Sequence, residues 1–303
     1  MPLVGHSPSP TSFRDGVTRP TILVTGATGQ LGYELARLLP EHGEVIALGR
    51  DRLELADVDA IRATVRAVRP QLIVNAAAYT AVDQAEREPE VAEAINARAP
   101  AVLAEEAKRL AAVLIHFSTD YVFDGVASTP YGEAAPTDPL NAYGRSKLHG
   151  EQAIAAADAT AITLRTSWVY ARRGHNFLLT MRRLGAERDV LRIVADLIGV
   201  PNWSRALAEA ITVLVARGLP ALGARAGLYH LSGHGQASWF EFAQAIFGDA
   251  ERPRLVPITT AEYPTPARRP AYAVLATAKF EQTFGFALPH WRDTLQRCMA
   301  APD

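Results

Sequence analysis

The sequence predicts an α/β protein built on a doubly wound parallel sheet, and three observations support this fold class. Short β-branched runs alternate with longer segments rich in Ala, Leu, Arg and Glu. The runs Thr21–Thr25 (TILVT) and Leu72–Asn75 (LIVN) are apolar throughout, as strands buried on both faces are. The intervening segments are long enough to be the helical crossovers that parallel strands need.

The elements follow in a regular order through the first half of the chain. We predict, in turn, strand Thr21–Thr25, helix Gly29–Leu39, strand Val45–Leu48, helix Ala60–Val68, strand Leu72–Asn75 and helix Glu90–Leu110. In the second half we predict strands Val113–Phe117 and Ile162–Ser167, a helix near Ser204–Ala216, a strand–loop–helix unit at Leu228–Phe247, and extended structure over Glu251–Pro270.

Composition excludes several classes of protein. The net charge is −1, with 31 Lys+Arg against 32 Asp+Glu, so no overall field favours nucleic acid or an anionic membrane. A single cysteine, Cys298, excludes an internal disulfide and a cysteine metal cluster. No apolar run reaches the roughly 18 residues of a membrane-spanning helix, and the N-terminus lacks the pattern of a signal peptide. We expect a cytoplasmic protein with neither nucleic acid nor membrane as partner.

The eight histidines give no sign of a metal site. They are scattered, and His230 and His234 form the only close pair, in a strand–loop segment where a helical ligand face is not expected. We therefore predict no bound metal.

A glycine-rich turn follows the first predicted strand. Gly26, Gly29 and Gly32 lie in GATGQLG, at the start of the first predicted helix. In this context the first glycine permits a tight turn, the second lets the backbone approach a diphosphate, and the third lets the helix pack closely on the strand. An ordinary glycine-rich βα loop is the alternative, but the strand and helix on either side favour a dinucleotide site.

The end of the second strand bears on which dinucleotide binds. An acidic residue there would favour NAD, but the strand VIAL ends in Gly49–Arg50, and Arg50 can pair with a 2′-phosphate. A solvated loop arginine is the alternative. We predict NADPH as the cofactor, with NADH tolerated.

Tyr143 and Lys147 form a candidate acid/base pair. They are four residues apart in AYGRSKLHGE, which is predicted to be helical to about Ile154, so both side chains lie on one helix face. An ammonium beside a phenol stabilises the phenolate and brings proton transfer closer to neutral pH. Because the chain has only three lysines, this spacing is informative, although a surface helix pair remains the alternative.

Polar residues at the ends of predicted strands complete the candidate catalytic site. Ser118 and Thr119 follow the strand AAVLIHF, and a hydroxyl there can hold a substrate carbonyl oxygen against the phenol, although such residues are also common turn formers. Asn75 precedes Ala76–Ala78, whose small side chains would let a cofactor approach the backbone, and Asn96 is a candidate support for Lys147. Together these features describe a short-chain dehydrogenase/reductase site.

Five segments carry a resemblance to a known family. GATGQLG, VNAAAYTAVDQAE, FSTDYVFDG, PLNAYGRSKLHGE and LRTSWVYA resemble, in order and spacing, the dTDP-4-dehydrorhamnose reductases, which are extended short-chain reductases. The resemblance covers roughly Thr21–Met299, including the tail PARRPAYAVLATAKFEQTFGFALPHW. The glycine turn and YxxxK are common to the superfamily, whereas STDYVFDG and NAAAYTAVD are far more specific.

The resemblance implies reduction of dTDP-4-dehydro-L-rhamnose to dTDP-L-rhamnose by NAD(P)H. Tyr143 would donate a proton to the C4 oxygen, Thr119 would hydrogen-bond that oxygen, and Lys147 would hold the nicotinamide ribose and tune Tyr143. Asp120, with Thr119, and Trp168 would contact the dTDP-sugar. The expected cofactor contacts are Gly26, Gly29, Gln30, Leu31, Gly32, Arg50, Glu54, Leu55, Ala77, Ala78, Tyr79, Asn96, Phe117, Tyr143 and Lys147. The resemblance also suggests a homodimer.

This interpretation divides the chain into an extension and two lobes. Residues 1–20, rich in Pro, Ser and Gly, are predicted to be a flexible extension. Residues 21–170 with about 203–228 are predicted to bind NAD(P), and about 171–202 with 229–303 to form a smaller substrate-binding lobe. The cleft would then lie over the carboxyl ends of the strands.

The sequence departs from the family pattern in two loops that are expected to line the sugar-nucleotide cleft. Leu197 stands where the family usually has glutamine, Pro201–Asn202 where it has Pro–Thr, and Tyr272 and Ala273 replace the Asn and Ser of RPxNS. Another nucleotide-linked 4-keto-6-deoxysugar reductase is therefore an alternative, as is an epimerase or dehydratase that returns the hydride. A dinucleotide-binding regulatory subunit without catalysis is a third alternative.

Overall fold

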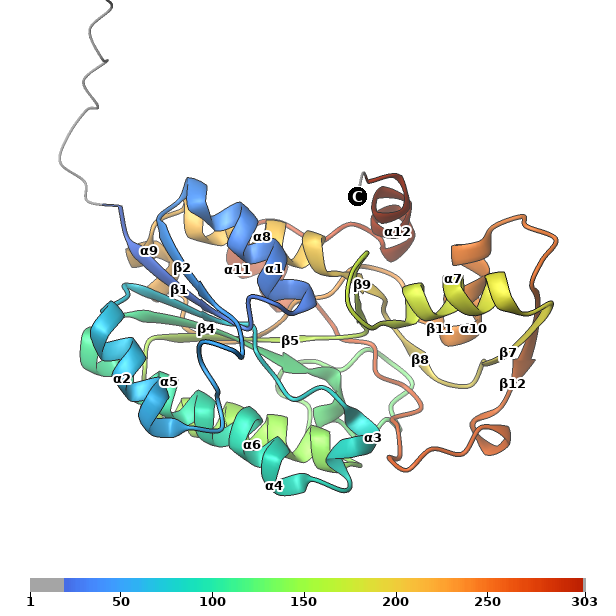
Figure 1. The fold of residues 1–303 in the computed structure, drawn as a ribbon, viewed down its shortest axis with the longest axis horizontal. Coiled ribbons are helices and arrows are strands. Elements are labelled where there is room, and N and C mark those ends of the chain that lie inside the picture. The colour runs from blue at the N-terminus through green and yellow to red at the C-terminus, as the bar shows by residue number, and fades with distance from the viewer. Residues whose placement is uncertain (1–18, 302–303) are drawn as a thin grey trace, which may run out of the picture.

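The computed structural model describes residues 19–301, so nearly all of the predicted extension at residues 1–20 lies outside the described residues. Its centre is a six-stranded sheet in the order β10–β5–β4–β3–β1–β2, parallel throughout (Figure 1). The strands are β1 (Thr21–Thr25), β2 (Glu44–Leu48), β3 (Leu72–Asn75), β4 (Val113–Thr119), β5 (Ala161–Thr166) and β10 (Gly227–His230). The predicted fold class is confirmed.

Helices cover both faces of the sheet. On one face lie α1 (Gln30–Leu38), α8 (Ser204–Ala216), α9 (Leu219–Gly223) and α11 (Ala278–Phe284). On the other lie α2 (Val58–Val68), α5 (Ala99–Leu110) and α6 (Ala142–Ala157), with the short α3 (Val82–Ala85) and α4 (Pro89–Glu93) beside them. Alternate strand residues serve the two cores: Ile22 and Val24 face α1 and α8, whereas Leu23 faces α2 and α5.

The predicted helix Glu90–Leu110 is interrupted. Between α4 and α5 the backbone makes a wider π turn, η2 (Ala94–Arg98). Pro100 has no N–H to donate to the carbonyl of Asn96 four residues earlier, which explains the wider turn. At Gly150 of α6 a Cβ would lie 2.1 Å from the Asn96 carbonyl oxygen, so α6 packs directly against this turn. The interruption places Asn96 beside the helix that carries Tyr143 and Lys147.

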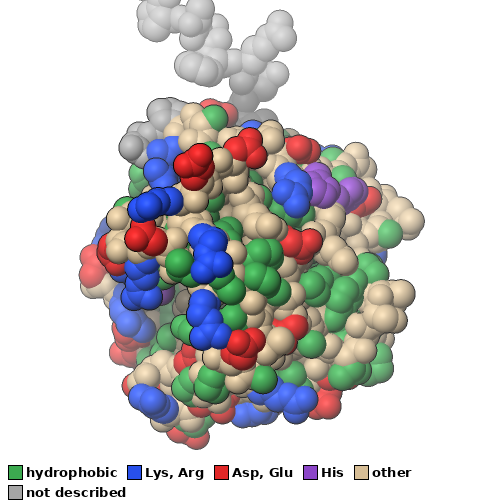
Figure 2. Space-filling view, turned by 90° about the vertical axis from the view of Figure 1, so that its right-hand side faces the viewer, with side chains coloured by type: hydrophobic (Ala, Val, Ile, Leu, Met, Phe, Trp, Pro, Cys, Tyr) green, Lys and Arg blue, Asp and Glu red, His purple; other side chains and the backbone are tan. Residues whose placement is uncertain are grey.

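The remaining elements gather at the other end of the molecule, on the right of Figure 1. They are β6 (Val169–Tyr170), α7 (Phe177–Glu187), β7 (Val190–Val194), β8 (Ile198–Gly199), β9 (Asn202–Trp203), β11 (Ala237–Ser238), α10 (Trp239–Phe247), β12 (Arg254–Ile258), η4 (Thr260–Glu262) and α12 (Trp291–Ala300). Tyr170, Phe242 and Trp291 are buried in their shared core. Figure 2 shows this end, where charged side chains of both signs are interspersed with hydrophobic ones. Within residues 19–301, no helix is both long and apolar enough to span a membrane.

The strand order reverses beside β1. The chain leaves β1 for β2 on one side, then passes back to β3 on the other. Open α/β sheets bind ligands outside the carboxyl ends of the strands at such a reversal. The glycine turn follows β1, Ala76–Ala78 follow β3, and Thr119 ends β4, so the predicted site residues meet at this edge.

Candidate active site

The glycine turn lies where the strand order reverses, and its glycines, which lack side chains, let other groups approach its backbone closely. Gly26 has φ +69°, and a Cβ there would lie 2.7 Å from the Ala77 Cα. A Cβ on Gly32 would lie 2.1 Å from the Gly26 carbonyl oxygen. Gly29 begins α1 without a side-chain cap, so the N–H groups of the first turn are not capped by a side chain. A side chain would clash with the backbone at Gly26 and at Gly32, and the cradle suits the diphosphate of a dinucleotide.

Arg50 lies just past the carboxyl end of β2, next to the glycine turn. Ala27 N donates to Leu48 O at 3.0 Å, which joins the two loops. The Arg50 side chain is 71% exposed and forms a salt bridge with Glu54 at 3.3 Å, from Arg50 Nε to Glu54 Oε2. An exposed guanidinium at this strand tip is accessible to a phosphate on the adenosine ribose. Leu55, also predicted to contact cofactor, is buried in the core between the sheet and α2.

Gln30, predicted to contact cofactor, also connects the glycine turn to the region around α7. Its Oε1 accepts a hydrogen bond from Asn176 Nδ2 at 2.9 Å, and its Nε2 donates to Val169 O at 3.4 Å. Asn176 is also the N-cap of α7, where it accepts from Leu179 N. Sequence analysis missed this link, because the two segments are far apart along the chain.

Tyr143 lies in the first turn of α6. Asn141 caps the helix by accepting from Gly144 N at 2.8 Å. The Tyr143 ring is half-buried and meets the edge of Tyr121 at 5.7 Å between centroids. Burial raises the pKa of Tyr143 to about 12, although a hydrogen bond with Thr119 opposes the shift. At neutral pH the phenol is therefore protonated, which is the form that a proton donor requires.

Lys147 lies one turn further along α6 and is 1% exposed. Its Nζ donates to Phe117 O at 2.6 Å and lies 3.3 Å from His116 Nε2. Burial lowers the pKa of Lys147 to about 8, while the Glu151 carboxylate acts to raise it. We expected the ammonium to lower the pKa of Tyr143, but the groups acting on that phenol are Thr119 and Asp120, and burial dominates.

Asn96 does not contact Lys147 as expected. Its side chain accepts from Tyr79 N at 2.8 Å and donates to Tyr79 O and to Ser146 Oγ, both at 3.0 Å. It therefore fixes the loop after β3 against α6. The side chain that meets Lys147 is His116, which sequence analysis missed. A polar residue within the apolar run VLIHF was the available signal.

Thr119 and Asp120 form the strand-end pair. Thr119 Oγ1 donates to Asp120 Oδ1 at 2.9 Å and accepts from Tyr121 N at 3.1 Å, which caps the short helix η3 (Asp120–Val122). Ser167 Oγ donates to Asp120 Oδ2 at 2.9 Å. Burial raises the pKa of Asp120 to about 7, and the hydrogen bonds from Thr119 and Ser167 oppose the shift. The Thr119 hydroxyl also acts to lower the pKa of Tyr143, so two predicted catalytic groups lie close enough to influence each other.

Trp168 forms an aromatic wall with a partner that sequence analysis did not identify. Its backbone has φ +40°, and its ring stacks on Trp239 at 3.6 Å and 7°. A Cβ on Gly199 would lie 2.5 Å from Trp168 Cε2, so β8 packs tightly against the ring. An L residue in this strained backbone conformation needs support from its surroundings, and the stacked Trp239 and Gly199 provide it.

The two segments that depart from the family pattern lie side by side. Ile198 N donates to Ala271 O and Ala273 N donates to Ile198 O, both at 2.8 Å. Leu197 is buried, and Tyr272 OH donates to Gln236 Oε1 at 3.3 Å. The departures at Leu197, Tyr272 and Ala273 therefore lie in two segments that are hydrogen-bonded to each other.

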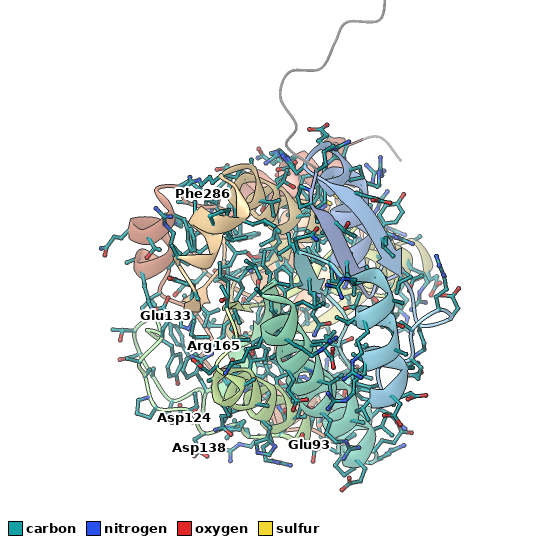
Figure 3. All side chains as sticks on the ribbon, turned by 90° about the vertical axis from the view of Figure 1, so that its left-hand side faces the viewer. Glu93, Asp124, Glu133, Asp138, Arg165 and Phe286 are labelled. Atoms are coloured by element: carbon teal, nitrogen blue, oxygen red, sulfur yellow. The ribbon has the colours of Figure 1, made fainter. Side chains whose placement is uncertain are left out.

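A second buried cluster lies beneath Lys147. Glu151 accepts from Arg165 Nε at 2.8 Å and from Arg165 Nη2 at 2.6 Å, and Ser118 Oγ also donates to it. Arg165 Nη1 lies 3.5 Å from His230 Nε2. Figure 3 shows Arg165 inside the fold, whereas Asp138 is at the surface. We call Ser118, Glu151, Arg165 and His230 the ion-pair cluster. Over residues 19–301, no group of three or more His, Cys, Asp or Glu side chains is placed to hold a metal ion.

The doubly wound sheet, the glycine turn and the Tyr–Lys helix beside a strand-end threonine define an oxidoreductase of the short-chain dehydrogenase/reductase class. Comparison with known proteins agrees. The family model described as the RmlD substrate binding domain matches residues 20–302. The dTDP-4-dehydrorhamnose reductase of Burkholderia thailandensis is 45% identical, over 92% of this chain and 97% of its own length.

A solved structure and a further relative extend the comparison. The structure of dTDP-4-dehydrorhamnose reductase from Bacillus anthracis in complex with NADP superimposes with a TM-score of 0.87 at 35% identity, covering 93% of this chain and 99% of that one. A probable dTDP-4,6-dihydroxy-2-methyloxan-3-one 4-ketoreductase from Streptomyces antibioticus is 44% identical over 93% of this chain and 94% of its own length. The chain belongs to the dTDP-4-dehydrorhamnose reductase family.

Proposed function

We propose that this protein reduces the C4 ketone of dTDP-4-dehydro-L-rhamnose to dTDP-L-rhamnose, using NADPH and accepting NADH. One observation carries the proposal: a protonated, half-buried Tyr143 lies near the strand-end Thr119, whose hydroxyl acts on the pKa of the phenol, at the sheet edge where the glycine turn lies. A protonated phenol beside a second hydroxyl is what a ketone needs in order to receive hydride at carbon and a proton at oxygen. The relatives named above support the choice of sugar nucleotide.

The glycine turn and Arg50 would bind the cofactor. The uncapped first turn of α1 would bind the diphosphate, and Arg50 the 2′-phosphate of NADPH. When bound, NADPH supplies the hydride. Lys147 Nζ carries three donors, of which two are directed at Phe117 O and His116 Nε2. The third would hold the nicotinamide ribose, which orients the ring toward Tyr143.

Tyr143 would protonate the C4 oxygen as the hydride reaches C4. The Thr119 hydroxyl, which donates to Asp120 without substrate, would donate to the same oxygen once Asp120 accepts a hydrogen bond from a sugar hydroxyl. Two donors aimed at one developing oxyanion stabilise the transition state. Loss of the Tyr143 proton leaves a phenolate, which the Thr119 hydroxyl would stabilise, since it acts to lower the Tyr143 pKa.

The second region of the chain would hold the sugar nucleotide. Trp168 would contact the substrate as a rigid aromatic surface, because Trp239 fixes its ring. Accordingly we propose that residues 21–170 with about 203–228 bind the cofactor and that about 171–202 with 229–303 bind the substrate. We also propose a cytoplasmic enzyme without nucleic acid or membrane partners, in keeping with near-zero net charge. A homodimer stays a prediction.

The test is an assay with enzymatically made dTDP-4-dehydro-L-rhamnose, run separately with NADPH and NADH. We expect loss of cofactor absorbance in a one-to-one ratio with sugar consumed, and dTDP-L-rhamnose as product by NMR. Sugar isomerisation without net cofactor consumption would instead show an epimerase. Tight NADPH binding without reduction of any 4-keto sugar nucleotide would show a non-catalytic binding protein.

A second candidate is reduction of a different dTDP-linked 4-keto sugar. The Streptomyces antibioticus relative is a probable 4-ketoreductase of another dTDP-sugar, at an identity close to that of the rhamnose enzymes. Leu197, Tyr272 and Ala273 also depart from the family pattern, in two segments that are hydrogen-bonded to each other. A kcat/KM higher for another dTDP-4-keto-6-deoxysugar than for the rhamnose precursor would favour this candidate.

A further inference from the structure

Three polar residues occupy one rung of the central sheet. Thr25 of β1 pairs in register with Asn75 of β3, and Asn75 pairs with His116 of β4. Because the strands are parallel and in register, these side chains project from the same face, toward α6. Each is at most 1% exposed. Their neighbours on this face, such as Leu23 and Ile73, are apolar core residues.

The rung forms a chain of hydrogen bonds that ends at Lys147. Thr25 Oγ1 lies 2.6 Å from Asn75 Oδ1, and Asn75 Nδ2 lies 3.0 Å from His116 Nδ1. On the other side of the ring, His116 Nε2 lies 3.3 Å from Lys147 Nζ. The chain of hydrogen bonds therefore runs from Thr25, which precedes the glycine turn, to Lys147.

His116 is electrically neutral in this setting. Burial lowers its pKa well below the usual value, and the charge of Lys147 adds to the effect. A neutral imidazole has one N–H and one acceptor nitrogen. When Lys147 is an ammonium, Nε2 must accept, so Nδ1 carries the hydrogen and the Asn75 amide turns its oxygen toward the ring. When Lys147 is a neutral amine, Nε2–H donates to it and Asn75 Nδ2 donates to Nδ1.

Other groups near Lys147 cannot replace His116. Glu151, one turn further along α6, has both carboxylate oxygens engaged by Arg165. Phe117 offers only a backbone carbonyl. Among the side chains of residues 19–301, His116 is the one hydrogen-bonded to Lys147 Nζ. The direction of the ammonium is therefore set by one carbonyl and one imidazole.

We propose that His116 is a positioning residue for Lys147, held in place through Asn75 and Thr25, and that this rung aims the ammonium at the cofactor's nicotinamide ribose. This inference rests on the proposed function, because it takes Lys147 to bind that ribose. His116 itself touches neither cofactor nor substrate and acts through Lys147. Its removal weakens the part of cofactor binding that depends on the nicotinamide half.

The experiment compares His116→Phe with His116→Gln. Phenylalanine fills the site without an acceptor, whereas glutamine retains an amide that can both accept and donate. Two ligands are titrated: NADPH, and adenosine 2′,5′-bisphosphate, which lacks the nicotinamide ribose. We expect His116→Phe to weaken NADPH binding by about tenfold or more, the effect of losing a hydrogen bond to a charged group. Binding of the bisphosphate should be unchanged, and glutamine should restore most NADPH affinity.

His230→Phe is the matched control. His230 is also a fully buried histidine of the central sheet, but it contacts Arg165 and Ala276 O instead of Lys147. The His230→Phe variant should have a lower midpoint of thermal unfolding than wild type, without a selective loss of NADPH affinity. A double variant, Asn75→Leu with His116→Phe, should weaken NADPH binding little more than His116→Phe alone, since both act through one chain.

The outcomes separate this inference from the proposed function. Wild-type NADPH affinity and KM in a folded His116→Phe protein would overturn the inference, as would equal weakening of both ligands. If His116→Phe does not fold, Asn75→Leu takes its place: weaker NADPH binding with unchanged binding of the bisphosphate supports the inference, and normal NADPH affinity contradicts it. A wild-type protein that binds NADPH but reduces no 4-keto sugar would overturn the function and leave the binding comparison intact.

Discussion

Two polar clusters flank the same helix and differ in whether their charges are satisfied. In the ion-pair cluster, Glu151 and Arg165 pair through two hydrogen bonds and are both nearly fully buried. In the reactive cluster, formed by Thr119, Asp120, Tyr143 and Lys147, burial shifts the pKa values of three groups toward their neutral forms.

The difference shows how one helix can carry both a structural and a chemical cluster. A buried carboxylate and guanidinium that satisfy each other have little capacity left for a ligand, and removing one partner is costly. Groups whose neutral forms are favoured by burial can gain new partners when a ligand arrives, and Asp120 and Lys147, with pKa values of about 7 and about 8, can exchange protons near neutral pH. Glu151 and Lys147 are only one helical turn apart, so their partners decide their roles.

The largest expected effect comes from Tyr143→Phe in the reactive cluster. Loss of the proton donor should lower kcat by roughly 10² to 10⁴, the range for general acid catalysis. The free energy of unfolding should change by less than about 1 kcal/mol, because one half-buried hydroxyl is removed. Steady-state assays and urea unfolding measure the two quantities. Near-normal turnover would contradict the assignment of Tyr143.

Glu151→Leu in the ion-pair cluster should have the opposite profile. It leaves Arg165 buried and unpaired, so the free energy of unfolding should fall by about 3–5 kcal/mol. Adding Arg165→Met should recover much of this loss, since an apolar pair replaces the ions. Denaturant unfolding of both variants tests this. A stability equal to wild type in Glu151→Leu alone would show that the ion-pair cluster is not structural.

The pH dependence of the free energy of unfolding should reveal the raised pKa of Asp120 in the reactive cluster. Its pKa is raised from 3.8 to about 7 in the fold, so between these values the folded state binds more protons than the unfolded chain. The contribution of Asp120 to the free energy of unfolding therefore falls as pH rises through this window, by about 4 kcal/mol in full. The buried neutral His116 and His230 contribute with the opposite sign in both proteins. Urea unfolding across the window should therefore show that stability falls more, or rises less, with pH in wild type than in Asp120→Asn.

Asp124→Asn provides the control of opposite sign. A hydrogen bond from Tyr131 lowers the pKa of Asp124, so its contribution to stability is present above the unfolded pKa and is lost as pH falls through the folded one. This variant should therefore keep the wild-type slope between the two Asp120 pKa values. An unchanged slope in Asp120→Asn would assign the pH dependence to other groups.

The smallest effect is expected at Arg50, whose charge is exposed rather than buried. Its salt bridge with Glu54 is solvent-exposed, so Arg50→Ala should change stability by no more than about 1 kcal/mol. The preference for NADPH over NADH in kcat/KM should nevertheless fall by roughly tenfold, because a hydrogen-bonded charge contact to the 2′-phosphate is lost. The neighbouring exposed Arg52, replaced by Ala, is the control and should leave the ratio unchanged.

Sequence alone determined the parts of this protein that are encoded over short stretches. The fold class follows from apolar strands alternating with helical segments, and the glycine turn from three glycines beside a strand. Tyr143 and Lys147 share a helix face because their spacing matches the helical period. These features depend on neighbours within a few residues, so local pattern was sufficient.

The tertiary structure decided which distant side chains meet. The rung Thr25–Asn75–His116 requires three strands in register, and the Trp168–Trp239 stack joins segments about 70 residues apart. Similarly, Lys147 faces His116 rather than Asn96, because the Asn96 side chain is engaged by the Tyr79 backbone and by Ser146. Register and packing set these contacts, since they depend on how separate elements dock rather than on spacing along the chain.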